Sequence, residues 1–232
     1  MLEYLDQNRS AGPGSIIVRR RPRWQGLNEN LAREVLELHT LGVDGPYSQT
    51  DVRELAELFT GMSRADDYGF VFRRNLAEPG AETVLGKTYG QGASLQHIET
   101  ALDDLARHPA TAAHIAHKLA VHFVGDVPSE DLVAHVRQAY AQSDGDLMQC
   151  YAALLEHPDA WVTPAQNIRP PQEFMSAALR AFGPPQQALS QMEPRDIGQV
   201  FHGPLRVMGQ PWENPAGPDG WAENDAAWVT PQ

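Results

Sequence analysis

Apolar residues recur every three or four positions along most of the chain, which is the spacing of the buried face of an α-helix. Six such runs lie between Leu27 and His157, each opened by a capping residue or proline and closed by glycine or proline. Their apolar faces are Leu27, Leu31, Val35 and Leu38; Val52, Leu55, Ala56, Phe59 and Met62; Leu95, Ile98, Leu102 and Leu105; Ala112, Ile115, Leu119 and Phe123; Leu132, Val133, Val136 and Tyr140; and Leu147, Tyr151, Leu154 and Leu155. The short connections between the runs favour antiparallel helices around a common core.

Capping residues indicate where these helices begin. Ser48 is followed three residues later by Asp51, an arrangement typical of a capping box, in which side chains bond the free backbone N–H groups of the first turn. Pro109 opens the fourth run, where a proline costs the helix no hydrogen bond. The sequence therefore predicts the starts of these helices as well as their buried faces.

A different pattern interrupts the helical runs between residues 69 and 89. Residues 69–72 and 83–89 alternate between apolar and polar side chains around the turn-forming sequence Glu78-Pro79-Gly80. This pattern predicts that the two segments pair as one small hairpin. The expected fold class is all-α, a mainly helical bundle with a small two-stranded β-hairpin insertion.

The composition changes after Trp161, where prolines become frequent. A seventh helix is predicted around residues 174–182 and a shorter one near 196–201, followed by a loop anchored by Trp212, Trp221 and Trp228. We therefore expect three parts: an N-terminal arm (1–26), a helical core with the hairpin (27–162), and a Pro-rich helical extension with a Trp-rich tail (163–232).

The composition narrows the class of protein. The chain has 232 residues, of which 42% are hydrophobic, enough for a real core, and its formal net charge is −12. We expect no nucleic-acid partner, because such a charge offers no basic field to phosphates. One segment is an exception: residues 19–23 contain four arginines, which can bind a phosphate. Such clusters more often form a solvated arm, and we favour that interpretation here. Cys150 is alone, which excludes an intrachain disulfide.

No apolar run approaches the ~20 residues of a membrane-spanning helix, and residues 1–6 do not resemble a signal peptide. We therefore expect no membrane span. Neither a nucleophile motif, a phosphate-binding loop nor a dinucleotide-binding glycine pattern occurs, and no cofactor is expected.

The first predicted helix carries candidate site residues. On a helical wheel Glu34 and Glu37 lie on one flank of the buried stripe, with Asn30 beside them. Two half-buried carboxylates can act as acid and base or bind a hard metal ion, but Arg33 lies four residues before Glu37 and can pair with it. Asn28 and Asn30 are residues preferred at helix starts. We favour the structural roles, an ion pair and a cap.

The fourth predicted helix contains several side chains that bind metals or protons: His114, His117, Lys118 and His122. No metal is expected, because the helix has no Cys, Asp or Glu to complete a ligand shell. His122 lies in the apolar stripe, so we expect it to be buried and to bond a partner such as Glu34 or Glu37. We favour a core histidine that braces two helices over a catalytic one.

These residues resemble a bacterial family called domain of unknown function 1800. The strongest similarity is the string from Asn28 to Gly42, Asn-Glu-Asn-Leu-Ala-Arg-Glu-Val-Leu-Glu-Leu-His-Thr-Leu-Gly. Further matches follow along nearly the whole chain: Tyr47, Asp51-Val52, Thr60-Gly61, Val84-Leu85-Gly86, residues 108–112, 118–120, 122–123 and 143–147, and the tail from Gly209 to Trp228. The resemblance brings no established activity.

The resemblance also carries expectations about the rest of the protein. Members are usually about twice this length, so the resemblance implies that an N-terminal half precedes the arm. Many look exported, which implies an envelope or periplasmic role, although the chain shows no signal peptide to support it. Where members often have a histidine before the Glu-Pro-Gly turn, this chain has Ala77, so a site using that histidine is incomplete here.

Two hypotheses for the function follow. The favoured one is a noncatalytic helical scaffold that binds a protein partner. The alternative is a metal-assisted hydrolase with a carboxylate and histidine site between the first and fourth helices. Its candidate catalytic residues are Glu34, Glu37 and His122, and the candidate binding residues are Asn28, Asn30, Arg33 and Lys118.

Overall fold

The structure is a computed structural model that describes residues 2–24, 26–65, 69–161, 168–217 and 220–229. It divides into two compact units, Met1–Ile115 with Arg137–Leu147, and Ala116–Val136 with Met148–Gln232. Both units consist mainly of helices, so the expected helix-dominated fold is confirmed. The boundaries proposed at residues 26 and 162 stay predictions. Among the described residues, no helix has the length and apolar character to cross a membrane.

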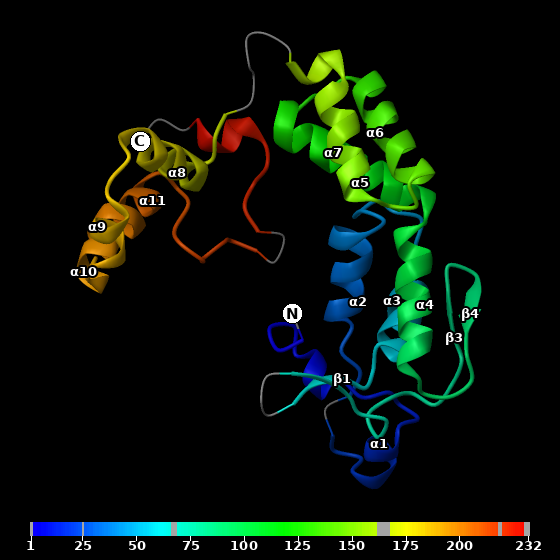
Figure 1. The fold of residues 1–232 in the computed structure, drawn as a ribbon. Coiled ribbons are helices and arrows are strands. Elements are labelled where there is room, and N and C mark those ends of the chain that lie inside the picture. The colour runs from blue at the N-terminus through cyan, green and yellow to red at the C-terminus, as the bar shows by residue number, and fades with distance from the viewer. Residues whose placement is uncertain (1, 25, 66–68, 162–167, 218–219, 230–232) are drawn as a thin grey trace. The chain divides into compact units, whose positions relative to one another are not determined.

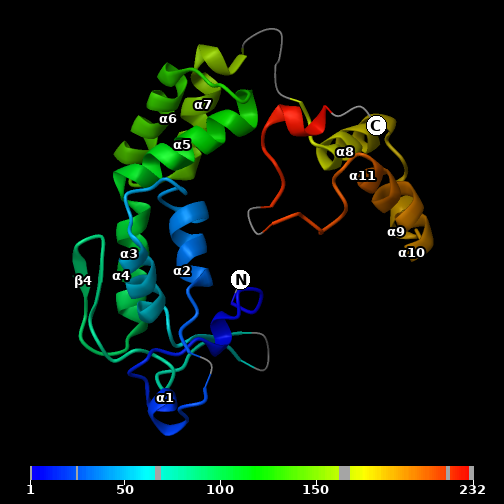
Figure 2. The same cartoon turned by 180° about the vertical axis from the view of Figure 1, so that it is seen from behind.

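The first unit contains the helices and strands up to the first half of α5, and the end of α6 (Figure 1). They are α1 (Ile16–Arg20), α2 (Asn30–Glu34) with a π-helical turn (Val35–His39), α3 (Gln49–Leu58), β1 (Met62–Arg64), β2 (Phe70–Phe72), β3 (Glu82–Val84), β4 (Lys87–Tyr89), α4 (Leu95–Ala106), and parts of α5 (Pro109–Val124) and α6 (Glu130–Gln142). Helices α2, α3 and α4 lie side by side in both views (Figures 1 and 2).

The second unit contains the remaining parts of α5 and α6 and all helices that follow. These are α7 (Leu147–Glu156), a 3-10 turn (Pro158–Trp161), α8 (Pro171–Phe182), α9 (Gln186–Ser190), α10 (Pro194–Ile197), a π-helical turn (Gly198–His202), α11 (Gly203–Val207) and a 3-10 turn (Asp225–Trp228). The predicted seventh helix is therefore α8, and the shorter one near residue 196 is α10 with the turn after it.

The core of the first unit contains apolar side chains of α2 and α3, together with others from the N-terminal segment, β3, β4 and α4. Leu36 and Leu55 are fully buried, Phe59 is 1% exposed, and Val52 and Leu31 belong to the same cluster. Burial of each large apolar side chain contributes roughly 1.5–3 kcal/mol to stability, so these few contacts dominate the local energetics. The apolar positions predicted for the second helix are thus confirmed as buried, except Met62, which lies in β1 because α3 ends at Leu58.

The predicted capping box at the start of α3 is present, and it has a second function. Ser48 and Asp51 exchange the side-chain to backbone hydrogen bonds of the motif. The second oxygen of Asp51 accepts the Leu85 N–H at 2.7 Å, which ties the helix start to the β3–β4 turn. Burial acts to raise the pKa of Asp51, but the bonds from Ser48 and Leu85 outweigh it, so this pKa lies below its ordinary value.

The single hairpin predicted between residues 69 and 89 is wrong in its pairing. Two separate antiparallel sheets form, one from β1 and β2 and the other from β3 and β4. The turn of the second sheet consists of Leu85 and Gly86, with φ angles of 50° and 76°. Such a turn normally requires Gly, Asn or Asp in its first position. Leu85 tolerates it because its N–H is bonded to Asp51 and its side chain packs on the core.

The buried face of α5 also differs from the prediction. Its buried residues are Thr111, Ala112, Ala116 and Ala120. Of these, Ala112 was predicted to be buried, whereas Phe123, also predicted to be buried, is 57% exposed. Small side chains on a helix face permit close packing, and the larger apolar residues Ile115 and Leu119 beside them are only half-buried.

Tryptophan rings of the tail make contacts within the second unit, but Trp212, expected to be an anchor, is 45% exposed. The Trp221 and Trp228 rings lie 6.4 Å apart, and Trp228 donates its indole N–H to the Ala222 carbonyl. Trp212 stacks on His202 with ring centroids 5.9 Å apart. Residues 218–219 and 230–232 of the predicted loop lie outside the described residues.

Glu82 is a buried carboxylic acid beside the α2–α3 core. Its side chain in β3 is only 4% exposed and faces Glu78, Glu57 and Glu54. Burial, followed by the negative charges of those three residues, raises the pKa of Glu82 to about 7. Because the folded protein holds this proton more tightly than the unfolded chain, the contribution of Glu82 to stability is full below pH ~4.5 and is lost as the pH rises through 7.

We expect Glu82→Gln, which mimics the protonated acid, to stabilise the protein at pH 8 by on the order of 2 kcal/mol, and by much less at pH 5. Urea unfolding at both pH values measures the difference, with Glu99→Gln on the exposed side of α4 as the control. An equal effect of Glu82→Gln at the two pH values would show that Glu82 does not titrate in this range.

Candidate functional site

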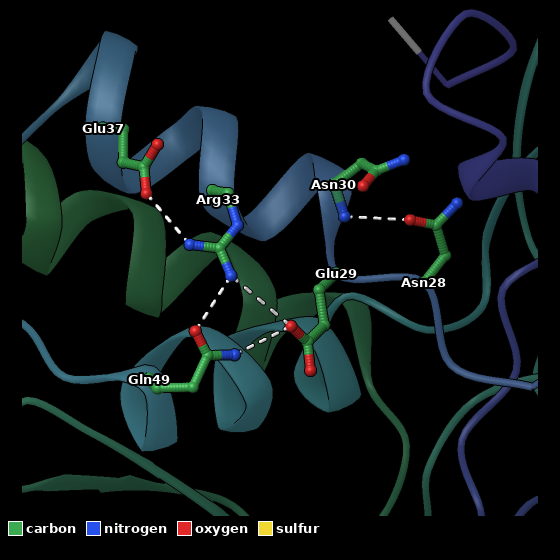
Figure 3. Close-up of polar contacts among 6 residues, drawn as sticks. All are labelled: Asn28, Glu29, Asn30, Arg33, Glu37 and Gln49. Carbon is green, nitrogen blue, oxygen red and sulfur yellow. Dashed lines mark hydrogen bonds and ion pairs between the residues drawn. The ribbon is translucent and has the colours of Figure 1, made fainter. Parts of the chain in front are cut away.

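Polar side chains of α2 and the start of α3 form a connected network, shown in Figure 3. Arg33 donates one hydrogen bond to Glu37, with Nη1 and Oε1 3.1 Å apart, and another to Gln49, with Nη2 and Oε1 2.9 Å apart. Gln49 in turn donates from Nε2 to Glu29 at 2.9 Å, and Glu29 lies 3.6 Å from Arg33. The guanidinium is therefore shared between two helices.

The intervals between these residues in the sequence explain the contacts of Arg33 with the two acids. Glu29, Arg33 and Glu37 are four residues apart, so their side chains line one face of the helix with the acids on either side of the base. The Arg33 side chain is 41% exposed, and each of these pairs therefore contributes only ~0.5 kcal/mol or less. The bond to Gln49 matters for orientation, because it relates α2 to the N-terminus of α3.

Asn28 connects the N-terminal segment to the start of α2. The N-cap residue of α2 is Glu29, one position later, but Asn28 Oδ1 accepts the Asn30 N–H at 2.8 Å and so satisfies a free N–H group of the first turn. Asn28 Nδ2 donates to the Leu5 carbonyl at 2.9 Å, and the Asn28 N–H donates to Ser10 Oγ at 3.0 Å. All polar groups of the Asn28 side chain thus hold backbone in place.

A cleft of about 450 Å³ opens beside this connection. Residues of the N-terminal segment and of the start of α2 line it: Asp6, Arg9, Ser10, Gly26, Leu27, Asn28, Glu29 and Asn30. Its walls therefore offer carboxylates, a guanidinium and amides, a mixture of donors and acceptors suited to a polar ligand without a large net charge. Asp6, one of the lining residues, has a left-handed backbone with φ of 54°.

Tyr47 adds a titratable group near the Arg33 network. Its hydroxyl donates to the Val43 carbonyl at 2.8 Å. Burial, and then the negative charge of Glu37, raise the pKa of Tyr47 above its ordinary value, so the hydroxyl stays protonated at neutral pH. It is a hydrogen-bond donor here.

The candidate catalytic residues stand as follows. Glu37 is bonded to Arg33, as the structural interpretation predicted, and Glu34 is half-buried. His122 is exposed, so its predicted burial is wrong, because the alanines of α5 form the buried face. Glu34 and Glu37 belong to the first unit and His122 to the second. Their convergence, and any catalytic role, stay predictions.

Other residues singled out on α5 have partners of their own. Within the first unit, the His114 ring lies against Gly42, and its Nε2 is 3.3 Å from the Leu38 carbonyl oxygen. Within the second unit, Lys118 forms an ion pair with Glu223 of the tail. In the part of the chain that the structure describes, no group of three or more His, Cys, Asp or Glu side chains is arranged to hold a metal ion.

The sequence interpretation did not propose Glu29, Gln49 or Tyr47 as site residues, although Glu29 and Tyr47 are among the residues that resemble the family. One signal was available for Gln49, because the capping box at Ser48 places it in the first turn of α3. The crossing of α2 and α3 that brings Gln49 to Arg33 has no signal in the local pattern.

We expect Arg33→Gln to lower the free energy of unfolding by about 1 kcal/mol, because three weak interactions are lost together. Combining it with Gln49→Ala is expected to cost ~0.5 kcal/mol less than the sum of the single changes, since the two side chains share a bond. Urea unfolding of the four proteins measures this coupling.

The matched control is Arg53→Gln, which removes an exposed arginine of α3 with a single ion-pair partner, Glu57, and is expected to cost less than ~0.5 kcal/mol. Strictly additive effects of the Arg33 and Gln49 changes would contradict the shared bond.

Comparison with known proteins gives a family but no relative of known function. The profile of the family described as "Protein of unknown function (DUF1800)" matches residues 1–232. The match includes residues 28–42, which contain most of the Figure 3 network. No curated protein and no solved structure matches the chain.

Proposed function

Because the chain belongs to the DUF1800 family, whose description assigns no activity, we propose a function from the chain's own residues: it is a helical scaffold that binds a polar segment of a protein partner in the cleft at the start of α2. The observation that carries the proposal is the pairing of an open, polar cleft with walls held by internal hydrogen bonds.

The rigidity of the cleft supports binding. Asn28 fixes one wall to the N-terminal segment through Leu5 and Ser10, and Arg33 fixes the start of α2 to α3 through Gln49 and Glu29. A preorganised wall loses little conformational entropy when a ligand binds, so even a modest contact area yields useful affinity.

The chemistry of the open side chains supports a peptide segment as the ligand. Asn30 is exposed, and an asparagine amide can donate to a peptide carbonyl and accept from a peptide N–H. Asp6 and Arg9 offer one charge of each sign at the same cleft, which suits a segment that carries both signs. The network of Glu29, Arg33 and Glu37 then acts as support for the site.

We expect a photo-crosslinking amino acid at position 30 to capture a defined partner in the cells that produce the protein, whereas the same group at exposed Gln149 of α7 does not. The captured peptide is identified by mass spectrometry. Replacing Asp6 and Arg9 by Asn and Gln is expected to lower the yield at position 30 at least severalfold, because the cleft loses one positive and one negative group that can pair with the ligand.

The outcome that would refute the proposal is equal capture of the same proteins from positions 30 and 149, or a yield at position 30 that the Asp6 and Arg9 changes leave unaltered. Circular dichroism of each variant separates a local effect from unfolding.

A further inference from the structure

A second pocket in the first unit, of about 300 Å³, lies where α4 meets α5 and where α6 ends. Three compact apolar side chains line it, those of Pro109, Ala112 and Ala141, and Arg107 and Arg137 line it as well. The volume is at the lower end for small-molecule sites, so it suits a ligand about the size of one ring.

The wall formed by Tyr140 is fixed. Its hydroxyl donates to the Ala106 carbonyl at 2.8 Å, which holds the ring against the end of α4. Gly145 packs against the same ring, where a Cβ would come within 3.3 Å of Tyr140, and its φ of +89° favours glycine. The pocket is therefore shaped by backbone and a locked aromatic side chain.

The two guanidinium groups differ in their partners. Arg107 donates from Nε to Asp144 Oδ1 at 2.8 Å, so its charge is balanced. Among the residues that the structure describes, no ion pair or hydrogen bond engages the side chain of Arg137. In a chain with a net charge of −12, an arginine without a partner beside an apolar pocket is an available anion-binding group.

We propose that this pocket binds a small carboxylate with a compact apolar body. The carboxylate pairs with Arg137, whose planar guanidinium matches its two oxygens, and the apolar body lies against Pro109, Ala112 and Ala141. A monoanion fits better than a phosphate dianion, because Asp144 adds a negative charge to the same pocket.

Benzoate is the probe and benzamide its neutral counterpart of the same shape. The full chain is titrated with each compound, and binding is monitored by ligand-observed NMR. Benzoate is expected to bind at least about tenfold tighter than benzamide, because it gains one charge-assisted hydrogen bond. Equal binding of the two, or none by benzoate at millimolar concentration, would overturn the proposal.

Two variants act in opposite directions. Arg137→Gln is expected to weaken benzoate binding about tenfold, since it removes the free guanidinium. Asp144→Asn is expected to tighten it, because Arg107 loses its carboxylate partner and becomes available, while Asn tolerates the left-handed φ of 57° at this position. A gain in affinity cannot come from unfolding.

The matched control is Arg195→Gln, an exposed arginine of α10 in the second unit, which is expected to leave benzoate binding unchanged. If Arg137→Gln binds benzoate as well as the wild type, or if Asp144→Asn binds it no better, the carboxylate site is refuted.

Discussion

The packing of α2 against α3 is the interaction on which the rest of the first unit depends. It contributes Leu36, Leu55 and Phe59 to the apolar core, and their removal from water outweighs any single polar contact at the surface. The polar groups around this core then determine its geometry. Arg33 and Gln49 relate the two helices at one end, and through α2 they position the cleft. The walls of the cleft are therefore positioned by the same helices that form the core.

Two carboxylates beside this core show how the environment decides the effect of a charge. Asp51 receives hydrogen bonds from Ser48 and Leu85, which favour its ionised form and make it stabilising at neutral pH. Glu82 is buried facing other acids, so its ionised form is unfavourable and its pKa is high. Asp51 joins the start of α3 to the β3–β4 turn, whereas Glu82 lowers the stability of the same region as the pH rises.

Local sequence patterns predicted the features that depend on residues close together in the sequence. Apolar spacing gave the helices, and the Ser48 cap and the Arg33–Glu37 pair followed from intervals of three and four. The failures involve contacts between distant segments. The β3–β4 turn depends on Leu85 in a strained conformation that a bond from another element compensates, and the bond from Arg33 to Gln49 depends on how two helices cross. Neither has a local signal.

Native-state hydrogen exchange, resolved at individual amides by NMR, tests the central role of the α2–α3 pair most directly. If the pair is the foundation of the unit, the amides of Leu36, Leu55 and Phe59 exchange only through global unfolding, with equal free energies that fall together as denaturant is added. Exchange of the α2 amides through a separate opening of lower free energy, while α3 stays protected, would contradict this account.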